Sequence, residues 1–203
     1  MVRLNLGCGP NVITDWVNVD YAFGAKLAKY KLFKILNKKY HLIGCDWNPD
    51  IFIHNLTKKF PWVDNSVDII YSSHTLEHLS KNEGIFFISE CYRVLKGNGV
   101  IRIIVPDLLE IINQYREGKI AANDVLEELG VLTIEKNNIN IRSLIKIIIS
   151  TPHKCMYDCD TLLNIMKSSG FKAQEKKAFD SVIKDISKIE IITADFVRLI
   201  TSI

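Results

Sequence analysis

The sequence has no run of about 20 apolar residues, which is the length that a membrane-spanning helix needs. Its first apolar stretch already ends at Gly7, before it reaches the length of a signal peptide, so we expect a cytoplasmic protein. The 26 Lys and Arg residues nearly balance the 23 Asp and Glu residues, and a net charge of +3 does not indicate nucleic acid as a partner. Repeats and low-complexity tracts are also missing.

Paired cysteines are missing as well. The five cysteines are odd in number and form no C-x-x-C pair, so we expect reduced thiols and no disulfide framework. Cys155 and Cys159 follow His153, but this spacing lacks a zinc knuckle and a second ligand pair, so we expect no metal. Glu77 and His78 have suitable side chains, yet neighbouring residues on a helix point in different directions and should not converge on one ion. We interpret both as structural.

What the sequence does contain is an alternation of apolar, strand-like runs and helix-like segments. Strands are predicted at residues 2–6, 16–20, 51–54, 67–71 and 100–105. Ser80 and Glu83 have the spacing of a capping box that begins a helix. Gly97 and Gly99 should end this helix. Asp107 and Asp160 are expected to cap two more helices. The alternation predicts an α/β three-layer sandwich with a mostly parallel sheet and helices on both faces.

One domain is expected to span the whole chain, with two segments that depart from the alternation. Residues 22–50 form a lysine-rich insertion, whose apolar residues at helical spacing predict an amphipathic helix. Residues 119–150 form a helical segment, with helices predicted at 121–129 and 141–149. After Gly170 two last strands are expected, although residues 195–200 would serve equally well as a terminal helix.

Two glycines and a carboxylate are predicted to meet at one edge of the sheet. Gly7 and Gly9 follow the first strand, and a residue without Cβ lets a ligand approach the backbone closely. Asp20 ends the second strand, where a carboxylate can accept hydrogen bonds from both hydroxyls of a ribose. The dinucleotide fingerprint would need a third glycine where this chain has Val12, so a nucleotide-dependent oxidoreductase is the weaker alternative.

Four sequence motifs follow one another in a fixed order. They are LNLGCGP at residues 4–10, VNVD at 17–20, the segment 60–79 and YRVLKGNG at 92–99. In this order they resemble the class I S-adenosylmethionine-dependent methyltransferases, in particular the type 11 group, whose substrates are often unassigned. The resemblance covers residues 3–107. It implies a Rossmann-like sheet of seven strands, S-adenosyl-L-methionine as cofactor and S-adenosyl-L-homocysteine as product.

The resemblance also implies a set of cofactor contacts. Gly7, Cys8 and Gly9 would lie against the methionine portion and ribose, and Asp20 would hold the ribose hydroxyls. The other implied contacts are Asn5, Asn55, Leu56, Ser72, Ser73 and His74. Where the family often has an acid, Asn5 can still bind an ammonium, and the side-chain carbonyl of Asn55 could accept from the adenine amino group. The short segment between Gly9 and Asp20 leaves little room for the usual first helix.

Methyl transfer from a sulfonium is an in-line displacement, so the protein mainly has to position the nucleophile and exclude water. If the acceptor is a hydroxyl, a histidine or carboxylate would help as a base, and the candidates are His74, Asp107 and His153. Asp107 also fits a helix cap. The expected acceptor is an oxygen or nitrogen of a small-molecule or lipid- or glycan-linked substrate. A protein that binds the cofactor without catalysis is the alternative.

The insertion offers a clue to partners. Six lysines alternate with apolar residues there: Lys26, Lys29, Lys31, Lys34, Lys38 and Lys39. The favoured interpretation is a solvated helix with one face on the domain; the alternatives are a lid or a peripheral contact with an anionic membrane, an acidic glycan intermediate or RNA. The sequence does not choose among these alternatives, nor does it indicate an oligomeric state.

Overall fold

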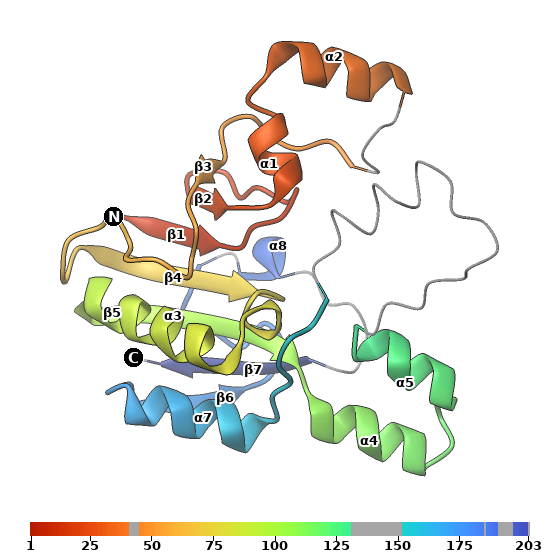
Figure 1. Cartoon of the computed structure of the whole chain (residues 1–203). Helices are drawn as coiled ribbons and strands as arrows, with labels where there is room; N and C mark the ends of the chain where they lie inside the picture. The colour runs from red at the N-terminus through yellow and green to blue at the C-terminus, as the bar shows by residue number, and fades with distance from the viewer. Residues whose placement is uncertain (41–44, 131–151, 185, 191–196, 203) are drawn as a thin grey trace.

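The computed structural model describes residues 1–40, 45–130, 152–184, 186–190 and 197–202 (Figure 1). In this part of the chain, seven strands form one sheet in the order β3-β2-β1-β4-β5-β7-β6. The strands are β1 (Arg3–Leu6), β2 (Val17–Asp20), β3 (Phe52–Ile53), β4 (Val67–Ser73), β5 (Leu95–Pro106), β6 (Ala173–Lys176) and β7 (Val197–Ser202). Neighbours from β3 to β5 pair in parallel, whereas β7 is antiparallel to both β5 and β6. The predicted α/β fold with a mostly parallel sheet is therefore confirmed.

Helices cover both faces of the sheet. They are α1 (Phe23–Leu27), α2 (Lys31–Tyr40), the 3-10 turn η1 (Leu76–His78), α3 (Lys81–Val94), α4 (Leu108–Arg116), α5 (Ala122–Glu128), α7 (Cys159–Ser168) and α8 (Ile186–Ile189). Figure 1 shows α3 and α7 in front of the sheet and α8 behind it. The helices α1 and α2 lie beyond the β3 edge, and α4 and α5 lie beyond the carboxyl end of β5.

The two faces of the sheet carry two separate cores because successive side chains of a strand point to opposite sides. On β4, Ile70 joins the large core under α3 and α7, whereas Tyr71 joins a smaller core with Ile186 of α8. On β5, Ile103 and Ile104 divide between the same two cores. The near-continuous apolar run of β5 is thus explained by burial on both faces.

Several element boundaries differ from the predictions, and three of them concern helices α3 and α7 and strand β5. Helix α3 ends at Val94 and β5 begins at Leu95, earlier than the glycines at 97–99 suggested, because Ser66 N donates to the Val94 carbonyl and β4 pairs with Leu95. Asp158, not Asp160, caps α7, since its side chain accepts from Thr161 N at 2.7 Å.

The remaining predictions about elements have mixed outcomes. Near the C-terminus, where the sequence allowed either a strand or a helix, the structure has a strand at residues 197–202. The insertion contains two helices, α1 and α2, instead of one. The helix predicted at 121–129 is confirmed as α5, whereas the one predicted at 141–149 lies outside the described residues. None of the described helices has the length and apolar character that crossing a membrane requires.

Candidate active site

A cavity of about 570 Å³ opens at the carboxyl ends of β1 and β4. Its size falls in the range of small-molecule sites, and its place is where open α/β sheets bind ligands. The lining comes from β1 and the loop after it, from the end of β4 with the residue that follows, and from α8: Asn5, residues 7–13, Tyr71, Ser73, His74 and Ile189. Four of the implied contacts, namely Gly7, Cys8, Gly9 and Asn5, thus share one cavity with Ser73 and His74.

The two glycines of the turn have different neighbours. Both adopt positive φ angles, 72° at Gly7 and 57° at Gly9, which side chains rarely tolerate. A Cβ on Gly7 would overlap the side chain of Thr75, so the turn closes tightly against the chain after β4. A Cβ on Gly9 would meet nothing within 4 Å. The backbone at Gly9 is therefore the part of the turn that a ligand can approach.

Asp20 lies buried beside this turn. Its Oδ2 accepts from Gly9 N and its Oδ1 from Ala22 N, both at 2.7 Å. A carboxylate oxygen can accept two hydrogen bonds, so each oxygen keeps acceptor capacity for a ribose hydroxyl. The carboxylate and the open backbone at Gly9 together fit the ribose portion that the resemblance assigns to them.

The loop between β1 and β2 contains no helix, as the short spacing suggested, and Asn18 holds it in place. The Asn18 amide accepts from Asn5 Nδ2 at 2.9 Å and from Ile13 N at 2.8 Å. It also donates to the carbonyls of Ile13 and Trp16. Sequence reasoning missed Asn18, although an asparagine inside an apolar strand is a signal, because strands are depleted in this residue.

Four of the implied cofactor contacts do not line the cavity, and one of them is Asp20, which contacts the turn at Gly9 N. Ser72 is buried and donates to the Leu6 carbonyl at 2.9 Å, so it joins β4 to β1. Leu56 belongs to the large core. The Asn55 carbonyl oxygen accepts from both the amide and the hydroxyl of Thr57, at 3.0 and 2.9 Å, and so closes a turn.

Burial controls the chemistry of two cavity residues. Desolvation raises the pKa of Cys8 to about 12, and the charge of Asp20 adds to this effect. The thiol stays protonated at neutral pH, which agrees with its interpretation as a space-filling residue. Burial also raises the pKa of Tyr71 to about 12. Tyr71 and Ile189, which the sequence did not single out, therefore offer a neutral hydroxyl and an apolar wall.

The three candidate bases occupy different environments. His74 lines the cavity with a φ of 50° and a side chain 39% exposed, and its Nδ1 lies 3.3 Å from Glu77 Oε1. Asp107 is buried, and its Oδ1 accepts from Leu109 N at 2.9 Å as the cap of α4. Neither Asp107 nor His153 lines the cavity. Burial lowers the pKa of His153, which favours the neutral imidazole.

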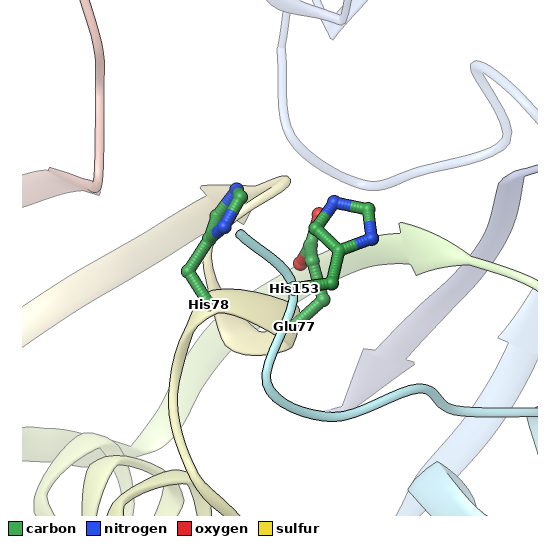
Figure 2. A group of neighbouring side chains, drawn as sticks. All are labelled: Glu77, His78 and His153. Carbon is green, nitrogen blue, oxygen red and sulfur yellow. The ribbon is translucent and has the colours of Figure 1, made fainter. Parts of the chain in front are cut away.

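Glu77, His78 and His153 form a cluster (Figure 2), and Glu77 also contacts His74. The ligand atoms of this cluster all lie within 4.8 Å of one another. The ligand atoms of Glu77 and His78 thus approach one another although the residues are neighbours, and His153 joins them from a segment that is distant in sequence. Lys154 N and Cys155 N both donate to the Glu77 carbonyl, at 2.8 and 3.1 Å, and so hold this segment in place.

Comparison with known proteins agrees with this geometry. Residues 4–103 match the family model described as a methyltransferase domain. No curated protein matches the chain. Among solved structures, a Methanosarcina mazei protein described as an S-adenosylmethionine-dependent methyltransferase has a TM-score of 0.55 at 14% identity, with 98% of this chain and 91% of that chain covered.

Two further solved structures share the fold. A Pyrococcus horikoshii protein has a TM-score of 0.52 at 14% identity, over 98% of this chain and 80% of that chain. A chain from a Haloferax volcanii complex that contains the methyltransferase activator Trm112 has a TM-score of 0.51 at 13% identity, over 100% of this chain and 81% of that chain. At such low identity, these similarities concern the fold alone.

Proposed function

We propose that this chain, whose residues 4–103 match the family model of a methyltransferase domain, is a class I methyltransferase that transfers the methyl group of S-adenosylmethionine to an oxygen or nitrogen of a small-molecule or lipid- or glycan-linked acceptor. One observation carries the proposal. The open backbone at Gly9 lines the cavity together with Ser73 and His74, and the Asp20 carboxylate accepts from Gly9 N at 2.7 Å.

Different residues around the cavity would bind different parts of the cofactor. Asp20 would hold the ribose hydroxyls while its bond to Gly9 N keeps the turn in shape. The Asn5 amide nitrogen donates to Asn18 Oδ1 and to the Asn11 carbonyl, which leaves the Asn5 side-chain carbonyl to accept from an ammonium group. Where the family often has a charged carboxylate, the Asn5 side chain would thus hold the ammonium through the dipole of its carbonyl group. The bound sulfonium supplies an activated methyl group.

His74 is the strongest candidate for a base among the three that the sequence offered. It alone of these three lines the cavity. Its Nδ1 faces the Glu77 carboxylate, an arrangement that leaves Nε2 to accept a proton from a hydroxyl acceptor. Because the leaving thioether is neutral, the reaction needs no acid, and proximity and exclusion of water supply most of the acceleration.

Calorimetric titration tests the cofactor assignment directly. We expect heat of binding with S-adenosylmethionine and S-adenosylhomocysteine and none with NAD. The third glycine of the dinucleotide fingerprint is replaced by Val12, which lines the cavity. Heat with NAD alone would favour an oxidoreductase instead. Binding of the sulfonium pair without methylated product across a broad set of acceptors would favour the non-catalytic alternative.

Helix α2 is the feature that favours a lipid-linked acceptor. Leu32 and Ile35, one helical turn apart, are 69% and 65% exposed, and Lys31 and Lys38 on the same helix are exposed too. These two apolar side chains therefore face solvent and do not pack on the domain, contrary to the interpretation of a helix with its apolar face on the domain. Exposed apolar side chains flanked by lysines are typical of helices that lie on anionic membranes.

The double variant Leu32→Ser/Ile35→Ser tests this contact. We expect it to bind phosphatidylglycerol vesicles at least about tenfold more weakly than the original protein, since two apolar side chains no longer enter the lipid. Affinity for S-adenosylmethionine should not change. The matched control is Leu109→Ser/Ile112→Ser on α4, where the two side chains have the same spacing and are 52% and 42% exposed. Equal vesicle binding by all three proteins would contradict the membrane contact.

A further inference from the structure

The Glu77 carboxylate is buried without a hydrogen bond to either oxygen in the described part of the chain. The residue is 0% exposed. The nearest basic group is the His74 imidazole, whose Nδ1 lies 3.3 Å from Oε1 but outside hydrogen-bond geometry. Lys154 points elsewhere, with its Nζ 3.9 Å from Glu83 Oε2. A buried charge of this kind is costly unless something pairs with it.

Two imidazoles lie beside this carboxylate. The ring centroids of His78 and His153 are 4.9 Å apart, and Figure 2 shows both rings on the same side of the η1 turn as the Glu77 side chain. His153 Nδ1 is buried and has no partner in the described part of the chain, whereas the ring hydrogen-bonds to the Leu129 backbone. His78 Nδ1 lies 3.5 Å from the Pro152 carbonyl. Histidines that bind metals typically direct their second nitrogen to such carbonyls.

We propose that Glu77, His78 and His153 bind a divalent transition-metal ion, with zinc as the best fit. Two imidazole nitrogens and one carboxylate oxygen are a ligand set found in catalytic zinc sites, where a fourth position stays open. Calcium and magnesium prefer oxygen ligands and fit this set less well. Zinc bonds of about 2.0–2.2 Å place tetrahedral ligand atoms about 3.3 Å apart. Small side-chain rotations would bring atoms that now lie within 4.8 Å to this spacing.

The position of the site suggests its role, and this role, unlike the binding itself, rests on the proposed methyl transfer. His74 lines the cavity and contacts the Glu77 carboxylate, so the ion would lie next to the place where an acceptor must bind. An ion with an open position binds a hydroxyl oxygen and lowers its pKa. The hydroxyl proton passes to His74, the oxygen forms a bond to the methyl carbon, and the carbon–sulfur electron pair stays on sulfur. The site therefore favours a hydroxyl acceptor.

Cobalt provides the direct test, because its visible spectrum reports the ligands. We expect metal-free protein to bind about one Co²⁺ per chain, and Zn²⁺ to displace it. His78→Ala and His153→Ala should each weaken binding at least about tenfold, since even loss of an outer partner costs that much. The control is His54→Gln, because His54 also has a buried nitrogen without a described partner but lies among aromatic rings away from the cluster. Equal cobalt affinity in all variants, or none in the original protein, would overturn the proposal.

Glu77→Gln separates metal binding from folding. In metal-free protein, we expect this variant to melt at the same temperature as the original or higher, because a neutral amide is less costly to bury than an unpaired carboxylate. Zinc should raise the melting temperature of the original protein but not of Glu77→Gln. A zinc effect in both would contradict the site. Affinity for S-adenosylmethionine, measured in parallel, shows separately whether the proposed function holds.

Discussion

Glu190→Ala is expected to lower the free energy of unfolding by about 3–5 kcal/mol, because it removes the carboxylate that lies against the buried charge of Arg102. Arg102 lies in the middle of β5 with a side chain 0% exposed, and its Nη2 is 2.9 Å from Glu190 Oε2, whose side chain is 1% exposed. Urea denaturation followed by circular dichroism measures the change. A loss below about 1 kcal/mol would contradict the prediction, since that is the range of exposed ion pairs.

Two further variants sharpen this experiment. Asp180→Ala removes the carboxylate of an exposed ion pair with Lys176 on the same segment, and we expect little change in stability. The double variant Arg102→Met/Glu190→Leu should recover much of the loss, because apolar residues can replace a buried ion pair. Recovery would be incomplete, since Arg102 also donates to the carbonyls of Lys177 and Asp180.

The ion pair also matters for the cavity. Glu190 follows Ile189, which lines the cavity from α8, and Arg102 ties this segment to the centre of the sheet. The interaction therefore positions one wall of the site from the back of the sheet. This is why we expect Glu190→Ala to affect cofactor binding as well as stability.

The second large effect is expected for Asp20→Ala, which should weaken binding of S-adenosylmethionine by about 1–3 kcal/mol. The carboxylate would accept hydrogen bonds from the buried ribose, and its bonds to Gly9 N and Ala22 N hold the turn at the same time. Calorimetry with S-adenosylhomocysteine measures the same loss without turnover. Unchanged affinity would contradict the role of Asp20.

The controls for Asp20 separate ligand contact from loop structure. Asp160→Ala removes an exposed carboxylate from the first turn of α7, and the affinity should stay as it is. Asp20→Asn keeps one acceptor oxygen but removes the charge, so we expect a smaller loss than with alanine. If melting temperatures fall in parallel with affinity, the turn rather than the ribose contact explains the effect.

Local signals in the sequence determined most of the elements that build the site. The capping box at Ser80 and Glu83 exists, with Glu83 Oε2 accepting from both the amide and the hydroxyl of Ser80 at 2.8 Å. The glycine turn, Asp20 and the cap at Asp107 also lie where spacing placed them. These features rest on hydrogen bonds within a few residues or on the period of a strand, which the order of residues along the chain specifies directly.

Tertiary structure alone decided the groups that only distant segments can assemble. His153 meets Glu77 because backbone bonds hold residues 152–155 against a 3-10 turn, and Glu190 meets Arg102 across the back of the sheet. In such turns and loops no regular period determines where a side chain points. Its direction and burial follow from packing against chain that is remote in sequence. Residues that looked merely structural therefore form the cluster of one buried carboxylate and two imidazoles beside the cavity.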